Sequence, residues 1–447
     1  MLLFLVIACG GSSAPSSVDS GSTEPGETAA PPKVEATFVD LELDAFPRPP
    51  SESCADRPVT HSVAVGDSIA AALSSASSGD LIEVAPGTYT ENAGEWFALE
   101  WSVDDLCLRV PDDHAVIEAA PGQNYGLRVT ANDVAIEGLM FTGFRTGVAL
   151  EAGPLENIAL ERVVVDQMTG DFRDGIGVFG AGTANKPAVD GLLLLDVLVR
   201  DADLGVSCGE GPCDHIWLER VLIQNRSSAD GSGADAFAVE SGRQVVIIDT
   251  TIEGAAADGI DIKGTDAVIQ RTVVKNVQRN GIKLWQGGDV VNAVVDGSGA
   301  DAALIGDGAG RYRYAHVLVT NHDPNGSGYV GTWGYDFGGD GMTVEFVNFV
   351  ASGNSSGGFF VHDDATQTIT TSWFEGDQGP VDLNANYGAD ALTDAGTIID
   401  GLNTDLNGDP RNQGSAPDIG PTESRRRGTG AGSGGQSNDI GRLPAQL

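Results

Sequence analysis

One alternation of small, polar and apolar residues recurs three times in the middle of the chain. It occupies the segments 234–239, 257–263 and 280–285, and equivalent positions lie 23 and then 22 residues apart. A repeat of this length is typical of a solenoid, in which each turn of chain is one structural unit. Because apolar and polar positions alternate within each segment, we expect short strands with one row of side chains inside and another outside.

Alignment of the three segments on a common small residue gives the columns of side chains that stacked turns would create. Two apolar columns are predicted to face inward: Phe237–Ile260–Ile282 and Val239–Ile262–Leu284. Three columns are predicted to face outward: Asp235–Asp258–Asn280, Ala238–Asp261–Lys283 and Glu240–Lys263–Trp285. Asp174 and Asp301 are expected to extend the first outward column. Carboxylates are thereby brought together at the spacing of neighbouring strands, about 4.8 Å.

The same phrase, a small residue followed by alternating positions, can be counted from about residue 115 to residue 370. Beyond the central segments it stands at 125–129, 146–150, 174–178, 204–208, 301–305 and 357–361. Second strands are expected between these phrases, at 157–165, 245–249 and 267–274. Parallel stacking of such turns would bury the inner residues in one continuous core. We therefore predict an all-β parallel solenoid as a single domain over residues 61–423.

A different pattern precedes the repeats. Asp67 is expected to cap a short helix that Gly79 ends. The apolar face of this helix would consist of Ile69, Ala72, Leu73 and Ala76. A strand at 81–84 and a Pro-Gly turn within 86–89 follow. This order closely resembles the N-terminal capping segment of right-handed parallel β-helix proteins, and the resemblance implies a single-stranded right-handed parallel β-helix with an N-terminal helical cap.

The first nine residues form a short apolar run that ends in Val-Ile-Ala-Cys9. The run is too short to span a bilayer, and it resembles the signal peptide and lipobox of bacterial lipoproteins, which implies a lipid on Cys9. The alternative is a stray apolar N-terminus. No Asp follows Cys9, so the custom of that family favours the outer membrane, with attachment through the lipid anchor only. Residues 10–60 are interpreted as a flexible tether and lead-in, and 424–447 as a disordered tail.

Charge narrows the range of partners. The 447-residue chain carries a formal net charge of −39, spread along its length. Because Lys and Arg supply the affinity for nucleic acids and anionic membrane surfaces, both are excluded as expected partners. The same charge argues against an anionic polysaccharide unless a cation inverts the local field, and the chain is expected to be a monomer. Lysine is scarce, yet three of the five lysines lie between 263 and 283.

Four cysteines follow the N-terminal one. An even number of cysteines in an exported protein suggests two disulfides. Cys208 and Cys213 would close a small loop and leave Cys54 with Cys107, although three connectivities are possible from the sequence. The spacings do not fit a zinc site.

The outward columns suggest a metal site. Stacked carboxylates repel one another unless a cation lies between them, and oxygen ligands favour a hard cation, calcium above all. Residues 234–285 resemble the ninth family of polysaccharide lyases, the calcium-dependent pectate lyases on a parallel β-helix. In that family an Asp, an Asp-Asp-Gly-x-Asp phrase and a later Asn-Gly-x-Lys-Leu-like phrase supply calcium ligands and a catalytic lysine. The resemblance implies calcium ligands at Asp235, Asp258 and Asp261 and a base at Lys283, whereas Ala257 replaces the first Asp of the phrase.

The chemistry of β-elimination explains these residue types. The reaction removes the weakly acidic C5 proton of a uronate, and a lysine accepts it only when a nearby cation or desolvation lowers the pKa of that lysine. Calcium would also stabilise the charge that develops on the substrate. Trp285 is a candidate to stack on a sugar ring, and Arg279 or Arg243 to hold a substrate carboxylate.

Two other functions remain open at this point. One is a non-catalytic surface module that binds glycan or mediates adhesion, in which Asp261 and Lys283 form only a cross-strand ion pair. The other is a glycoside hydrolase that uses Asp235 and Asp258 as paired carboxylates. A lyase needs Lys283 and calcium, a hydrolase needs an acid with a raised pKa, and a binding module tolerates the loss of Lys283.

Overall fold

The computed structural model describes most of the region between residues 54 and 354 and parts of the chain on either side. The described residues are 48–49, 54–151, 153–169, 174–180, 182–183, 186–209, 211–225, 234–299, 302–323, 329–333, 341–354, 365–374, 392, 395–399, 402–411 and 416–423. The predictions for Cys9, for the signal peptide, for most of the tether and for the tail lie outside these residues. Within them, no helix is long and apolar enough to cross a membrane.

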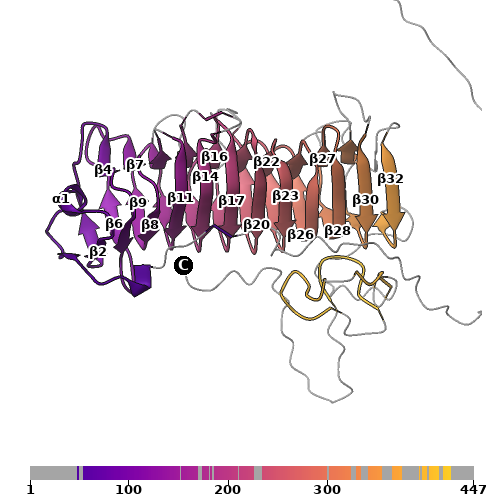
Figure 1. Cartoon of the computed structure of the whole chain (residues 1–447). Helices are drawn as coiled ribbons and strands as arrows, with labels where there is room; N and C mark the ends of the chain where they lie inside the picture. Colours follow the sequence, from indigo (N-terminus) through magenta and orange to yellow (C-terminus); the bar gives the residue numbers. More distant parts are fainter. Residues whose placement is uncertain are drawn as a thin grey trace, which may run out of the picture.

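The described strands stack into an elongated parallel solenoid (Figure 1). Successive turns each give one strand to a ten-stranded sheet, called the small sheet below. Its strands are β4 (Phe97–Trp101), β7 (Tyr125–Val129), β10 (Thr146–Leu150), β13 (Asp174–Val178), β16 (Leu204–Cys208), β19 (Phe237–Val239), β22 (Ile260–Ile262), β25 (Ile282–Leu284), β27 (Ala302–Gly306) and β29 (Tyr329–Trp333). All pairings within it are parallel, as the repeat predicted.

The other strands form a 23-stranded sheet, called the large sheet below, which runs as two parallel columns. The first column is β1 (His61–Val63), β2 (Leu81–Val84), β5 (Leu106–Arg109), β8 (Val134–Glu137), β11 (Leu155–Glu161), β14 (Val189–Leu195), β17 (Cys213–Glu219), β20 (Gly242–Ile248), β23 (Thr265–Gln270), β30 (Thr343–Val347) and β32 (Thr366–Thr370). The second is β3 (Gly87–Tyr89), β6 (Ala115–Glu118), β9 (Leu139–Thr142), β12 (Val164–Asp166), β15 (Leu198–Arg200), β18 (Leu222–Gln224), β21 (Thr251–Ala255), β24 (Val273–Val277), β31 (Val350–Ser352) and β33 (Trp373–Phe374). Two longer strands, β26 (Gly288–Ser298) and β28 (Arg311–Thr320), pair with both columns and join them.

The inward columns predicted from the repeat are confirmed. Phe237 pairs with Ile260 and Ile260 with Ile282, and the second column pairs in the same way. The six side chains of these two columns are at most 1% exposed and belong to one apolar core that extends through the described turns. Burial of this continuous apolar stack is the main source of solenoid stability.

One short α-helix, α1 (Ile69–Ser75), packs beside β1, β2 and β4 at one end of the solenoid (Figure 1). Its N-cap is Ser68, whose hydroxyl oxygen accepts a hydrogen bond from an amide of the first turn. The predicted cap at Asp67 is therefore wrong by one residue, because Asp67 accepts a bond from an amide of the preceding turn. The helix also ends earlier than predicted, at the C-cap Ala76 rather than at Gly79.

The two predicted disulfides have different outcomes. Cys208 and Cys213 form a disulfide, as predicted. Cys54, in a short 3₁₀ helix (η2, Cys54–Asp56), and Cys107, in β5, are both buried and remain thiols. A hydrogen bond with Cys107 and burial raise the pKa of the Cys54 thiol, and the Cys54 sulfur donates a hydrogen bond to the carbonyl of Ala135. The pair is thus brought together but is not bonded.

A C-terminal segment within 392–423 packs on the outer surface of the large sheet near β26 and β28 (yellow in Figure 1). Leu392, Ile399, Leu402 and Ile419 join its apolar contacts. Arg411 donates hydrogen bonds to Asn292 of β26 at 2.5 Å and to Glu423 at 3.1 Å. Because Arg411 and Glu423 side chains are each 1% exposed, this segment is fixed by a buried ion pair as well as by apolar burial.

Candidate functional site

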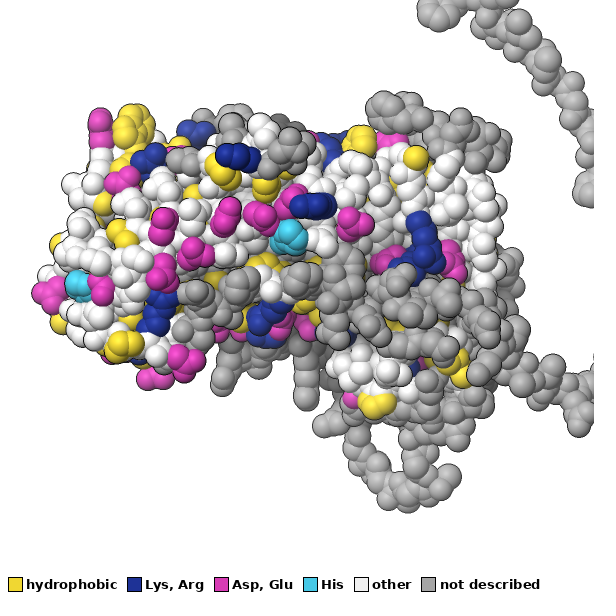
Figure 2. Space-filling view, in the orientation of Figure 1, with side chains coloured by type: hydrophobic (Ala, Val, Ile, Leu, Met, Phe, Trp, Pro, Cys, Tyr) yellow, Lys and Arg dark blue, Asp and Glu magenta, His cyan; other side chains and the backbone are white. Residues whose placement is uncertain are grey.

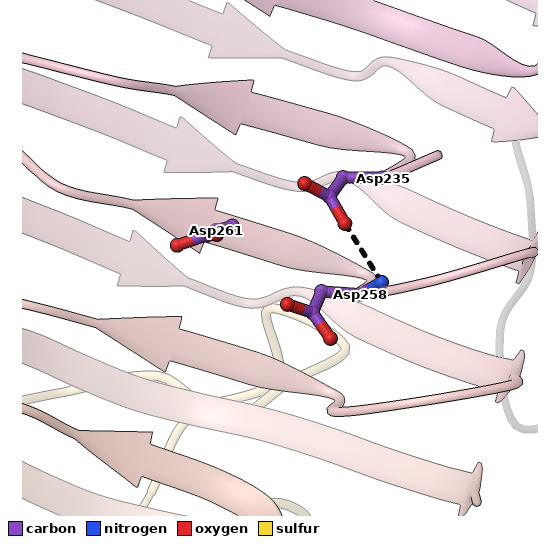
Figure 3. Close-up of side chains that lie close together, drawn as sticks. All are labelled: Asp235, Asp258 and Asp261. Atoms are coloured by element: carbon purple, nitrogen blue, oxygen red, sulfur yellow. Dashed lines mark hydrogen bonds between the residues drawn. The ribbon is translucent and has the colours of Figure 1, made fainter. Parts of the chain in front are cut away.

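Three carboxylates meet on the outer surface of the small sheet. Asp235 immediately precedes β19, Asp258 precedes β22, and Asp261 lies in the middle of β22. One oxygen from each lies within 4.8 Å of the other two, and Figure 3 shows the three side chains close together on neighbouring turns. Asp258 and Asp261 are 1% and 4% exposed, and Asp235 is half-buried. The structure therefore gathers all three predicted ligands, and we call them the acidic triad.

Hydrogen bonds between successive turns hold the first outward column in place. The Asp258 amide donates to Asp235 Oδ1 at 2.9 Å, the contact dashed in Figure 3. The Asn280 amide and its side-chain Nδ2 both donate to Asp258 Oδ1, at 3.0 and 2.8 Å. The Ala302 amide continues the series by donating to Asn280 Oδ1 at 3.4 Å. These bonds engage one oxygen of Asp235 and one of Asp258 and leave the second oxygen of each for other contacts.

The same register decides how far this column extends. Asp174 belongs to it, because Asp174 pairs with Leu204 and the next turn brings Asp235 to the equivalent position. The position that follows Asn280 in this column is Ala302, because Ile282 pairs with Leu304. Asp301, the residue predicted for that position, lies outside the described residues.

Two glycines allow the turns that carry the triad to approach closely. A Cβ on Gly259 would lie 2.4 Å from Val274 and 2.6 Å from the Gly281 carbonyl oxygen. A Cβ on Gly281 would lie 2.3 Å from Val295. Neither glycine has a positive φ, so each is required by close packing rather than by turn geometry. The Asp-Gly and Asn-Gly phrases are therefore packing features of the core.

Lys283 lies against the acidic triad. It pairs with Asp261 across β22 and β25, as the alignment predicted. Its Nζ is 3.6 Å from Asp258 Oδ2 and 3.6 Å from Asp261 Oδ2, and its side chain is 16% exposed. The proposed base is thus in direct contact with two of the three proposed ligands, Asp258 and Asp261, on the neighbouring turn.

Trp285 connects the lysines to the triad. Its indole Nε1 donates a hydrogen bond to Asp261 Oδ1 at 2.6 Å. The Nζ atoms of Lys283 and Lys263 lie 4.6 and 5.5 Å from the centre of its ring, within the range of cation–π attraction. Lys263 also pairs with Glu240, and its Nζ is 4.0 Å from Asp261 Oδ2. Trp285 therefore orients Asp261 and two ammonium groups, a role that residue types alone did not reveal.

The site has a deficit of positive charge. Four carboxylates, those of the triad and Glu240, face two ammonium groups, so two negative charges are unbalanced when all are ionised. Burial, followed by repulsion from Asp258, raises the pKa of Asp235 to about 6. Burial also raises the pKa of Asp261, although Lys283 opposes the shift. Convergent carboxylate oxygens with a charge deficit of two fit a divalent cation, and hard oxygen ligands fit calcium.

The remaining predicted site residues have distinct positions. Ala257 is 2% exposed and offers no side-chain oxygen beside the triad. Arg279 is exposed, next to Asn280, and its amide donates to the Ala257 carbonyl. Arg243 lies on β20 of the large sheet, where its guanidinium donates to Asp214 at 2.9 Å. The backbone of Arg279 is thus on the turn next to that of Asp258, whereas the Arg243 side chain pairs with another carboxylate on another sheet.

A hollow of about 710 Å³ lies apart from the triad, at the turns that lead into β10, β13 and β16. It is lined by Gly143, Asp166, Gln167, Met168, Thr169, Arg200 and Asp201. Arg200 donates to Asp166 at 2.8 Å across its wall. The convergent carboxylates, rather than this hollow, are the chemical centre of the described residues.

No known protein family matches this sequence, and no curated protein matches it. Solved structures do resemble the fold. The crystal structure of pectate lyase Pel9A is 15% identical, covers 83% of this chain and 98% of its own, and gives a TM-score of 0.50. The A-module of Azotobacter vinelandii mannuronan C-5 epimerase AlgE6 is 13% identical, with coverages of 68% and 93% and a TM-score of 0.37. The alginate lyase of Paenibacillus sp. strain FPU-7 is 14% identical, with coverages of 70% and 99% and a TM-score of 0.36. At such identities the likeness to Pel9A establishes the parallel solenoid fold alone.

Proposed function

We propose that this chain is a polysaccharide lyase that cleaves a uronate-containing polymer by calcium-assisted β-elimination. The observation that carries the proposal is the contact of Lys283 Nζ with two carboxylates of the acidic triad, each at 3.6 Å. A base and a cluster of hard-cation ligands in direct contact are what elimination next to a carboxylate requires. The fold shared with a pectate lyase agrees with this proposal.

The donor set supports calcium as the cofactor. Calcium prefers six to eight oxygen ligands and tolerates irregular geometry. The triad supplies three carboxylates on neighbouring turns, and Ala257 supplies none. A site with few protein ligands leaves positions for water and for a substrate carboxylate. Bound calcium would neutralise that carboxylate and the negative charge that develops next to it.

The residues of the chain then divide the remaining tasks. Lys283 is the group that would accept the C5 proton, because its side chain is 16% exposed and therefore more accessible than those of Asp258 and Asp261, at 1% and 6%. Trp285 would hold Asp261 and the ammonium group of Lys283 in place through its indole N–H and its ring. Arg279, which is exposed and one residue from Asn280, would bind a further substrate carboxylate.

Ultraviolet detection of unsaturated uronate, released from a panel of polyuronates with calcium or with chelator, tests the proposal. The wild type should release product only with calcium, and Lys283→Ala should release none. Lys275→Ala is the matched control, since Lys275 pairs with Glu253 on a different sheet, and it should retain activity. Product that is independent of both calcium and Lys283 would refute the lyase proposal. An absence of product together with retained binding would favour a non-catalytic glycan-binding module.

One observation favours a glycoside hydrolase as the second candidate. Asp235 has its pKa raised to about 6 by burial and by Asp258, and a carboxylic acid with a raised pKa beside a carboxylate is the pattern of glycosidases. Against it, Asp258 Oδ1 is already engaged by Asn280. Release of new reducing ends without unsaturation, insensitive to chelator and lost in Asp235→Asn, would establish this candidate instead.

We also propose that the protein is lipid-anchored at the outer membrane through Cys9. The support is the apolar run that ends in Val-Ile-Ala-Cys9, followed by a segment rich in Ser, Gly and Pro. Expression with radiolabelled palmitate, followed by membrane fractionation, tests it. The wild type should be labelled and membrane-bound, whereas Cys9→Ala should be unlabelled. An unlabelled wild type would refute the anchor.

A further inference from the structure

The outward column that contains Asp261 continues away from the triad as a row of small residues. Strand pairing places Ala238 on β19, Ser207 on β16, Gly177 on β13 and Ala149 on β10 in this row. On the other side of Asp261 the row continues to Lys283. Because these side chains are small, they leave a shallow strip on the outer surface of the small sheet between the triad and the earlier turns. The strip alone does not indicate a ligand, but two side chains beside Gly177 do.

The first of these side chains is Phe179, which follows β13 directly. Its ring reaches back over Gly177, so that a Cβ on Gly177 would lie 2.4 Å from Cζ and 2.6 Å from Cε2 of the ring. Gly177 therefore leaves the space that the ring occupies on the outer surface of the small sheet. Phe179 is half-buried, so part of the ring is open to solvent. An open aromatic ring on a strand surface is suited to pack against the C–H face of a sugar.

The second side chain is Asp174, at the start of β13. It stands three residues before Gly177, as Asp258 stands three residues before Asp261, and both belong to the same outward column. Asp174 is 9% exposed, and no hydrogen bond to its carboxyl group is found among the described residues. Its charged neighbours are Arg145 and Asp203, and burial raises the pKa of Asp174 to about 6. A buried carboxyl group without a hydrogen-bond partner is costly, and a ligand hydroxyl would supply the missing bond.

We propose that Phe179 and Asp174 form a saccharide subsite, and that a polysaccharide chain lies along the solenoid axis between this subsite and the acidic triad. Three strand spacings separate Gly177 from Asp261, about 14 Å. The small residues Ser207 and Ala238 form the surface under the intervening sugars. This inference rests on the proposed function, because it takes the triad as the place of the reacting sugar.

The chemistry of the subsite defines what it binds. The Phe179 ring contacts a C–H face, and the Asp174 carboxyl group bonds a hydroxyl group, so the sugar there is held through neutral groups. A uronate carboxylate next to Asp174 would be repelled when both are ionised. The subsite therefore binds a sugar whose carboxylate points away from the sheet, or a neutral sugar of a mixed polymer.

Calorimetric titration with oligosaccharides of increasing length tests the subsite. The titrated protein carries Lys283→Ala so that nothing is cleaved, with calcium present throughout. Further replacement Phe179→Ala or Gly177→Ala should weaken binding about tenfold, and only for oligosaccharides long enough to reach β13. In Gly177→Ala the atoms that lie nearest to the new Cβ are those at the tip of the Phe179 ring. The backbone of this row accepts alanine, since Ala149 and Ala238 stand at equivalent positions on other turns. Asp174→Asn, which keeps a hydrogen-bonding group, should weaken binding less than Asp174→Ala.

Phe97→Ala is the matched control. Phe97 is an aromatic residue of the same sheet on β4, three turns beyond β13, and its ring is covered by Arg128 at 5.6 Å. An oligosaccharide just long enough to span from the triad to Phe179 should bind this variant as it binds the parent. Thermal unfolding of each variant verifies that the fold is retained.

The outcomes separate this inference from the proposed function. Equal binding of all lengths by the parent and by Gly177→Ala and Phe179→Ala would overturn the subsite, as would an equal loss for short and long oligosaccharides. Failure of the parent to bind any polysaccharide would overturn it as well. If the wild type cleaves no polymer, but the length-dependent loss is found, the lyase proposal fails and the subsite stands.

Discussion

At the residue scale, the site is a set of side chains whose charges depend on one another. Asp261 accepts a hydrogen bond from Trp285 and faces Lys283, while Asp258 faces Lys283 with the one oxygen that Asn280 does not hold. Without a cation, Lys283 is the nearest positive charge to two buried carboxylates. A cation bound by those carboxylates would compete with the Lys283 ammonium group for the same oxygens, so metal binding and the charge state of the proposed base would be coupled.

Trp285→Phe separates the two roles of the indole. The variant keeps a ring beside Lys283 and Lys263 but removes the N–H that bonds Asp261. We expect a loss of about 1–3 kcal/mol in unfolding free energy, since a buried carboxylate loses a donor, and a lower calcium affinity. Urea unfolding and calcium calorimetry measure both effects. Unchanged stability and unchanged affinity would show that the N–H has no positioning role.

The raised pKa of Asp235 predicts a pH dependence of the metal-free protein. Its pKa is 3.8 as a reference and about 6 in the folded protein. Because the pKa of Asp235 is higher in the folded than in the unfolded protein, the protonated side chain favours folding. This contribution of Asp235 to stability is full below pH 3.8 and is lost as the pH rises through about 6. In chelator, unfolding free energy should therefore fall across this range, and less steeply in Asp235→Asn. Equal slopes of the two proteins in urea titrations at several pH values would contradict the prediction.

At the element scale, the register of the small sheet could be read from the sequence because its repeat is regular. The spacings of 23 and 22 residues aligned β19, β22 and β25 correctly and placed Lys283 beside Asp261. The next turn has two adjacent alanines, Ala302 and Ala303, and either could be aligned with the small residue Gly281. In the structure Ala303 is opposite Gly281, where the two turns pack closely. Local pattern alone does not choose between two small residues.

Strand ends were harder to predict than strand positions. The strands expected at 157–165 and 267–274 are each broken into two, β11 and β12, and β23 and β24. The breaks occur at Arg162 and Arg271, which adopt φ values of 50° and 48°. Arginine is not a residue that favours this region, so no local signal marks the bend. It is imposed by stacking, since each bend lies over the bend of the turn before.

Gly259→Ala tests the account of the closely approaching turns. The new Cβ would meet a core methyl group and a backbone carbonyl, neither of which can move far. We expect a loss of about 1–3 kcal/mol in unfolding free energy, as for overpacking of a core. Gly177→Ala is the control, because it displaces only the tip of the Phe179 ring. Equal stability of both variants in urea unfolding would contradict the packing argument.

At the scale of the whole molecule, the acidic composition is distributed over ladders of ion pairs along the solenoid. Arg220 donates to Asp196 at 2.7 and 2.9 Å, and Arg271 to Asp249 at 2.6 and 2.8 Å, in each case across neighbouring turns. Figure 2 shows acidic side chains following one another along one face, with basic ones among them. The sequence has 64 acidic residues and 25 Lys and Arg residues, which gives the net charge of −39. The uncompensated negative charge would repel an anionic polymer. A bound cation is therefore central to any binding of polyuronate.

The docking of the C-terminal segment is a further property of the whole molecule that the repeat did not predict. Its contacts join residues more than a hundred positions apart, such as Arg411 and Asn292. Arg411→Ala would leave Glu423 buried without its partner and should cost about 3–5 kcal/mol in docking free energy. Limited proteolysis should then release the segment within 392–423 faster than in the wild type. Equal rates of release would show that apolar contacts alone hold the segment.

Calorimetric titration of the chelator-treated protein with calcium tests the central claim most directly, because both the elimination chemistry and the balance of charge at the acidic triad depend on a bound cation. We predict one calcium ion per chain in the wild type. Asp261→Asn keeps the acceptor for Trp285 but removes a charge, and it should bind calcium at least about tenfold more weakly. No binding by the wild type, or equal binding by Asp261→Asn, would contradict the account.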